Sequence, residues 1–414
     1  MMESANPRIN PKSPTGEEVD TVPSASTRGL LGPLALALPS EEQTWLLQAC
    51  LMAGDEGTRA WRSWQRRIGD PIALLRLDNE GVKGLLPLLF TARGNSDVMM
   101  DGLLKTTIKT AYLNEEVRFR SYDRICHLVL SVFSKADVEV VVFKGADLAY
   151  TVYDLPILRH TDGLDLMIKD GYLQSAADLL GAMGCKLSAT PAERHWRTVK
   201  ARHKSGLTIT LHRSPFDLPF PVPVDELWMR SELGSIAHAP ARLLSPADSL
   251  LVICVGLYLG EIHAPLRWAC DGAYIVRRRP DLDWRVLVDF SRSNQMALPL
   301  VLTLGYLAQH LNAPIPGRVI ELLAHSAGET RVEAREAFLS GARRSRRGGF
   351  RRMLRAAPDW RTRLSVIRWI LFPTPSYLRW TRGIHAAQLP LHYLLRPFKY
   401  IARRKRIGPR HGRR

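Results

Sequence analysis

The 414-residue chain has few cysteines, and their spacing matches no common metal site. No two of them form a C-x-x-C pair, which gives no support to a zinc site or a disulfide framework. We expect reduced cysteines buried in the core and predict a cytoplasmic location. The five are Cys50, Cys126, Cys185, Cys254 and Cys270.

The sequence also lacks an apolar run as long as a membrane-spanning helix requires, about 18 to 20 residues. The nearest is residues 250–260, which has the length of a buried core helix. We therefore expect no transmembrane segment. The phosphate-binding signature G-x-x-x-x-G-K-[ST], the zinc-protease signature H-E-x-x-H and the hydrolase signature G-x-S-x-G are absent as well.

Acidic residues are scarce at the C-terminal end. Residues 331–414 hold 23 Lys and Arg but 3 Asp and Glu, whereas the preceding 330 residues hold 35 basic and 37 acidic residues. Residues 361–414 suit either RNA or an anionic membrane surface, because cations can neutralise phosphates while aromatic rings stack on bases or settle at the lipid interface. The alternative is a helical subdomain with a basic end that binds nothing specific.

The central stretch, residues 138–169, combines strands, a glycine turn and acids. The β-branched run 138–143 predicts a mostly buried strand that ends at Lys144 and Gly145. A helix is expected over 146–153, then a loop. A second strand over 164–168 carries Asp165 near its start.

A third strand is predicted at residues 207–212, where apolar and polar residues alternate. Leu207, Ile209 and Leu211 share one face, so Thr208, Thr210 and His212 share the other. With a long helix over 103–135 and helical patterns on both sides, the expected fold class is α+β: a mixed sheet core with flanking helices and a helical C-terminal region.

These residues resemble an uncharacterised bacterial nucleotidyltransferase family related to polymerase-β-type enzymes. The resemblance rests on a lysine-glycine turn, an arginine and an acid-bearing strand, and it covers about residues 40–320. It implies a nucleotidyltransferase-like core that moves a nucleoside monophosphate from an NTP to an unidentified acceptor, with Mg²⁺ or Mn²⁺. The matching residues are Lys144, Gly145, Ala146, Arg159 and 164–168, supported by 208–212, 245–251, 266–271 and 283–284.

The chain departs from the family pattern at two of its three acidic positions. Only Asp165 stands where a carboxylate is expected; Gly163 and Thr210 occupy the other two places. Asp162 is one residue out of step. Either a bulge at Gly163 turns its carboxylate towards Asp165 to share a metal, or Asp162 is a solvated or capping loop residue. The chain is accordingly either a metal-dependent nucleotidyltransferase or a degenerate member that binds nucleotide, RNA or a membrane surface without turnover.

Other side chains are candidates for the same site. Lys144 and Arg159 border loops at the strand mouth and are expected to bind phosphate, with Gly145 allowing close backbone approach. His212 is expected either to orient a water or ligand or to be a structural residue. The basic segment 194–204 either covers the pocket or is solvated.

On the following helix, Arg267 and Asp271 lie four residues apart and are expected to pair with each other, with Asp271 a supporting residue of the cleft.

We predict five segments from composition and pattern. They are a disordered N-terminal segment (1–28), an N-terminal helical region (29–135), a nucleotidyltransferase-like core (136–240), a helical domain (241–330) and a basic, partly helical tail (331–414).

Overall fold

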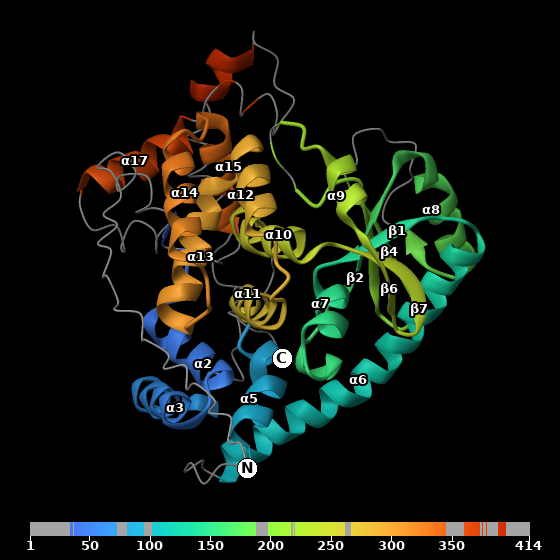
Figure 1. The fold of residues 1–414 in the computed structure, drawn as a ribbon, viewed down its shortest axis with the longest axis horizontal. Coiled ribbons are helices and arrows are strands. Elements are labelled where there is room, and N and C mark those ends of the chain that lie inside the picture. The colour runs from blue at the N-terminus through green and yellow to red at the C-terminus, as the bar shows by residue number, and fades with distance from the viewer. Residues whose placement is uncertain are drawn as a thin grey trace, which may run out of the picture.

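The computed structural model describes residues 34–35, 37–72, 81–94, 102–187, 198–216, 218, 220–260, 266–344, 360–372, 375, 378 and 388–394. The predicted disordered segment 1–28 and the basic end after residue 394 lie outside these residues. The predicted α+β class is confirmed: helices surround a single mixed sheet (Figure 1).

The sheet has seven strands in the order β3-β4-β5-β2-β1-β7-β6. β2 lies between β1, to which it is antiparallel, and β5, to which it is parallel. The three predicted strands therefore share one sheet, with starts shifted by one or two residues. The strands are β1 (Val140–Phe143), β2 (Gly163–Ile168), β3 (Lys186–Leu187), β4 (Thr198–Arg202), β5 (Thr208–His212), β6 (Glu232–Ile236) and β7 (Ala239–Leu243).

The alternation of side chains along each strand gives the sheet two different faces. One face is aliphatic and packs in a core with α6 (Gly102–Lys135) and α8 (Leu173–Ala182); Val142, Leu166 and Ile209 belong to it. The other face contributes Phe143 and Met167 to a second core, which the N-terminal helices and the helices after the sheet form. We call these helices together the helical half. Polar residues at the ends of this second face therefore lie between sheet and helices.

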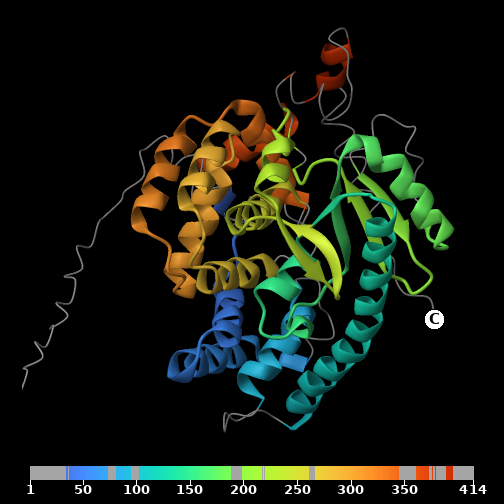
Figure 2. The ribbon, with the colours of Figure 1, turned by 45° about the vertical axis from the view of Figure 1, so that its right-hand side comes forward.

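Helix α6 (Gly102–Lys135) runs along the aliphatic face of the sheet and confirms the long helix predicted from the sequence (Figure 2). Its buried residues recur at helical spacing, as in Ile125, Val129 and Phe133. Because the helix has 34 residues, it extends beyond the sheet, and its N-terminal part meets α5 (Leu86–Arg93).

The helical half is built around α10, whose 14 residues are all buried. The side chain of Ser245 caps its first turn by accepting from the backbone of Asp248. N-terminal helices pack into the same core. The helices of this half are α2 (Glu41–Leu51), α3 (Gly54–Ile68), α5 (Leu86–Arg93), α10 (Pro246–Leu259), α11 (Arg267–Arg278), α12 (Trp284–Ser293), α13 (Ala297–Leu311), α14 (Gly317–Gly328) and α15 (Val332–Arg344).

The remaining helices are short, apart from the 12-residue α17. They are η1 (Lys83–Leu85), α7 (Gly145–Thr151), η2 (Pro156–Leu158), η3 (Asp170–Tyr172), α9 (Val224–Arg230) and α17 (Trp360–Leu371). The prediction of reduced, buried cysteines is confirmed, since all five are free and buried. Among the helices that the structure describes, none is both long and apolar enough to cross a bilayer.

One predicted segment boundary falls inside a strand, and another falls between two helices of the same core. Residue 240 lies within β7, which pairs with β1 in the middle of the sheet. Beyond residue 331, α15 still buries Ala334, Phe338 and Ala342 in the core of the helical half. In packing terms, the helical half thus extends to the end of α15.

Candidate active site

Asp165 lies where three strands come together. In register, its Cα pairs with Phe143 at the end of β1 and with Thr210 in β5. Because residues two apart share a face of a strand, Thr210 and His212 lie on the same side of the sheet as Asp165. The sequence predicted this grouping, and it faces the helical half.

The carboxylate of Asp165 is held by His212. The His212 Nε2 atom lies 2.7 Å from Oδ1 of Asp165, and its ring meets Phe143 edge-on, with centroids 5.0 Å apart. Burial acts to raise the pKa of Asp165, but the hydrogen bond from His212 and the positive charges of Lys144 and Arg159 outweigh it and lower that pKa. Asp165 is therefore an anion at neutral pH, and Nε2 donates to it.

Lys144 occupies an unusual backbone conformation immediately after β1. Its φ of 60° and ψ of −125° fall in a region that side chains with a Cβ rarely adopt. Such strain persists where surrounding structure enforces it, and it often accompanies functional sites. Its ammonium group lies 5.0 Å from the centroid of the Phe143 ring, and its charge helps to lower the pKa of Asp165.

Gly163 opens β2 without a bulge. The strands β2 and β5 pair residue for residue from Gly163 to Met167, so of the two alternatives for Asp162 the bulge at Gly163 does not occur. A Cβ at position 163 would stand 2.5 Å from the backbone oxygen of Thr208. The close approach of the two strands at this point requires glycine, and this explains why no side chain occupies the first acidic position.

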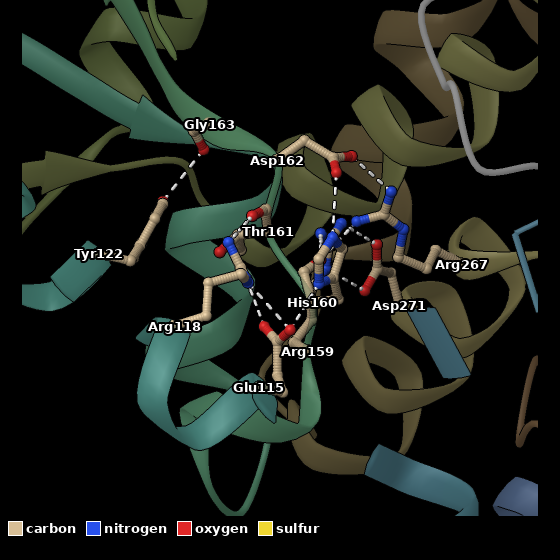
Figure 3. A network of polar contacts seen from close by, with 10 residues as sticks. All are labelled: Glu115, Arg118, Tyr122, Arg159, His160, Thr161, Asp162, Gly163, Arg267 and Asp271. Atoms are coloured by element: carbon tan, nitrogen blue, oxygen red, sulfur yellow. Dashed lines mark hydrogen bonds and ion pairs between the residues drawn. The ribbon is translucent and has the colours of Figure 1, made fainter. Parts of the chain in front are cut away.

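Asp162 instead belongs to a network of charges beside the strand (Figure 3). Its Oδ2 lies 2.5 Å from Nη2 of Arg267, and its Oδ1 lies 3.1 Å from Nε2 of His160. Burial acts to raise the pKa of Asp162, but these two partners lower it far below its usual range. Asp162 as a metal ligand stays a prediction; both of its carboxylate oxygens already contact cations or donors.

Helix α6 holds the other side of this network through residues that the sequence reading missed. Glu115 accepts from Arg118 and lies 2.7 Å from Nδ1 of His160. Arg118 also donates to the carbonyl of Thr161, and Tyr122 donates to that of Gly163. The spacing of residues 115, 118 and 122 places them on one face of the helix, a signal that could have identified them.

Arg159, a predicted phosphate binder, is buried in an ion pair with Asp271 of α11. Its Nη2 lies 2.7 Å from Oδ2, its Nε lies 3.1 Å from Oδ1, and the hydroxyl of Tyr153 donates to the same carboxylate at 2.8 Å. The predicted pairing of Arg267 with Asp271 is therefore wrong. A contact across 112 residues has replaced the local one.

Gly145 lies directly against the Arg159 side chain of this ion pair. A Cβ at this position would lie 3.0 Å from Nη1 of Arg159 and 3.1 Å from Cγ2 of Thr161. The absence of a side chain therefore lets the backbone at residue 145 pack closely on Arg159. The sequence had instead predicted that Gly145 allows the backbone to approach phosphate closely. Its role towards phosphate stays a prediction.

The basic segment 194–204 is described from residue 198 onwards. Lys200 and Arg202 are exposed in β4, while His203 is buried and contacts Ser205 at 2.9 Å. The covering role of the segment stays a prediction, because residues 194–197 lie outside the described part.

The residues present do not fit the pair of metal ions that nucleotidyl transfer uses. Hard cations such as Mg²⁺ prefer several carboxylate oxygens. Position 163 has no side chain, Thr210 offers a hydroxyl, and Asp165 already binds His212. Within the described residues, no group of three or more His, Cys, Asp or Glu side chains is arranged to hold a metal.

A scan against family models matches residues 77–312 to a family described as "Uncharacterised nucleotidyltransferase". Neither the curated proteins nor the solved structures provide a match. The matched region includes the whole sheet, the Lys144 turn, Asp165 and the helix that carries Asp271. Since the match covers more than half of its residues, this chain belongs to the uncharacterised nucleotidyltransferase family.

Proposed function

We propose that this protein binds a nucleoside triphosphate at the end of β1 and has lost metal-dependent nucleotidyl transfer. The observation that carries the proposal is the arrangement around Asp165. A strained, cationic Lys144 lies beside it, while the two neighbouring acidic positions are Gly163 and Thr210.

The binding half of the proposal rests on charge and backbone geometry. The turn after β1 keeps Lys144 in a strained conformation, which has a cost of order 1–3 kcal/mol. Thr210 and His212 lie on the same face and add polar groups for a ligand. A nucleotide phosphate near Lys144 would find a cation and the Thr210 hydroxyl without a metal ion.

The loss of transfer follows from the carboxylates. A two-metal site uses bound ions to stabilise both the attacking and the leaving oxygen. Asp165 alone cannot hold two such ions, and Asp162 is engaged by Arg267 and His160. We infer that Asp162 serves as an ion-pair partner and that His212 orients the Asp165 carboxylate.

The test is to measure ATP binding by calorimetry in EDTA and in Mg²⁺, together with transfer from labelled NTPs onto protein and RNA acceptors. We expect ATP to bind in EDTA, Lys144→Ala to weaken it about tenfold, and no label to be transferred. The transfer assay also includes Asp165→Asn, which removes the charge of the proposed site carboxylate. Its control is Asp178→Asn, on the exposed surface of α8.

Transfer remains the second candidate function, because the family carries that name and Asp165 keeps one family acid. Mg²⁺-dependent labelling that Asp165→Asn abolishes and Asp178→Asn preserves would establish it and refute the loss of activity. Absence of ATP binding in both conditions would refute the nucleotide site.

A further inference from the structure

Helix α17 presents an apolar stripe to solvent. Trp360, Leu364, Ile367 and Leu371 recur at i, i+4, i+7 and i+11, the spacing of one helix face. The stripe is most open at its start, where Trp360 is 65% and Leu364 is 53% exposed. A soluble surface rarely exposes such large apolar groups in succession.

A second helical piece continues this apolar surface. In residues 389–394, Leu391 and Leu394 lie one turn apart and are 61% and 68% exposed. The rings of Phe372 and Tyr393 approach with centroids 6.5 Å apart and join the two pieces. We define the tail surface as the described apolar side chains of both pieces, namely Trp360, Leu364, Ile367, Leu371, Phe372, Leu391, Tyr393 and Leu394.

The charged residues within this segment of the sequence are of one sign. Residues 360–394 contain five arginines and no acid. On α17, Arg363 and Arg368 are exposed and flank the apolar stripe on opposite sides. An apolar stripe bordered by cations and containing Trp is the pattern of a helix that lies in a membrane interface.

We propose that the tail surface docks on an anionic lipid bilayer, with α17 and residues 389–394 lying in the plane of the interface. Cations flanking the stripe meet the headgroups, and the exposed leucines enter the acyl region. RNA explains the arginines and aromatic rings but gives no role to exposed Leu364, Leu391 and Leu394. The aliphatic groups therefore favour lipid.

The experiment compares the full chain with Leu391→Glu/Leu394→Glu in vesicle co-sedimentation. The vesicles contain either neutral phosphatidylcholine or about 30% phosphatidylglycerol. The matched control is Met229→Glu/Leu233→Glu, which makes the same charge change at positions 75% and 83% exposed on α9 and β6. A short single-stranded RNA and light scattering in solution complete the set.

We expect the full chain and the control to bind anionic vesicles but not neutral ones, with binding weakened by about 0.5 M salt. The tail variant should bind at least tenfold more weakly. Equal vesicle binding by the tail variant and the control overturns the proposal. So does a chain that binds RNA but no vesicles, or one whose tail leucines instead hold a dimer in solution.

Discussion

Asp162 and Arg267 form an ion pair, with Oδ2 and Nη2 2.5 Å apart, between the start of β2 and the start of α11. Arg267 is 8% exposed and also donates to the carbonyl of His160. The carboxylate one residue before Gly163, where the sequence resemblance leads us to expect an acid, thus neutralises a buried arginine beside the strand mouth. Removing this carboxylate should affect ATP binding differently if Asp162 is an ion-pair partner than if it is a metal ligand.

Asp162→Asn should strengthen ATP binding in EDTA by roughly fivefold, because it removes a negative charge near the proposed phosphate position and frees Arg267. Calorimetric titration measures this. The control is Asp154→Asn, whose aspartate is equally exposed and pairs with Arg278 away from the site. Weaker Mg²⁺–ATP binding with unchanged binding in EDTA would instead assign Asp162 to a metal.

Breaking the buried pair of Arg159 and Asp271 should reduce the free energy of unfolding strongly. Asp271→Asn leaves a buried guanidinium without its counter-charge, at a cost of about 3–5 kcal/mol. The double change Arg159→Met/Asp271→Leu should recover most of that loss. Urea denaturation measures both, with Asp281→Asn at an exposed pair as control. An Asp271→Asn effect no larger than the control would contradict the prediction.

The central strands could be predicted because their pattern is local. Alternation in residues 207–212 and the apolar run at 138–143 define strands whatever their neighbours. The alternation of side chains along a strand also predicted that Asp165, Thr210 and His212 share a face. β6 and β7 could not be found in this way, because Gly234 and Pro240 weaken the strand signal. Their structure depends on pairing with each other and with β1.

The pairing within the site could not be predicted, because its partners are distant in the sequence. A spacing of four on a helix predicted Arg267 with Asp271, yet each side chain found a partner more than 100 residues away. Nor does the sequence reveal that the β2–β5 approach leaves no room for a side chain at Gly163. Tertiary packing decides both.

The structure predicts different outcomes for the two missing acids. Thr210→Asp places a second carboxylate in register with Asp165 and should create detectable Mn²⁺ binding, measured by electron paramagnetic resonance. Gly163→Asp should destabilise the fold, because its Cβ would meet the backbone of Thr208 at 2.5 Å. A stable Gly163→Asp protein that binds Mn²⁺ more tightly than Thr210→Asp would contradict this expectation.

Stability should depend on pH through His160. Burial acts to lower the pKa of His160, but hydrogen bonds to Asp162 and Glu115 raise it above its usual value. Its contribution is therefore complete below about pH 6.5 and is lost as the pH rises through the raised pKa. The pKa values of Asp162 and Glu115 are lowered, so their contributions are present above about pH 4 and are lost in acid.

We expect the free energy of unfolding to fall as the pH rises from about 6.5 through the raised pKa of His160. His160→Gln should flatten this decline, because glutamine keeps a donor but does not titrate. Urea denaturation at several pH values measures the slope, with His310→Gln as a control outside the network. Equal slopes for His160→Gln and the parent would show that His160 does not carry the dependence.

Lys144 allows strain and charge to be separated with two substitutions. Lys144→Gly removes the side chain and permits the φ of 60° without steric cost, so the free energy of unfolding should rise by about 1 kcal/mol. Lys144→Ala removes the same charge but retains the Cβ and its strain. ATP binding should be weaker in both variants and to a similar extent, because both lose the ammonium group that we propose contacts the phosphate.

Urea denaturation and calorimetric ATP titration of the same two proteins provide the measurement. A more stable but weaker-binding Lys144→Gly protein would mean that the strained turn holds the lysine in place for its ligand, at the expense of stability. If Lys144→Gly is less stable than Lys144→Ala, the conformation is not strained and the turn has a purely structural origin. If both variants bind ATP as tightly as the parent, the ammonium group of Lys144 is not a phosphate ligand.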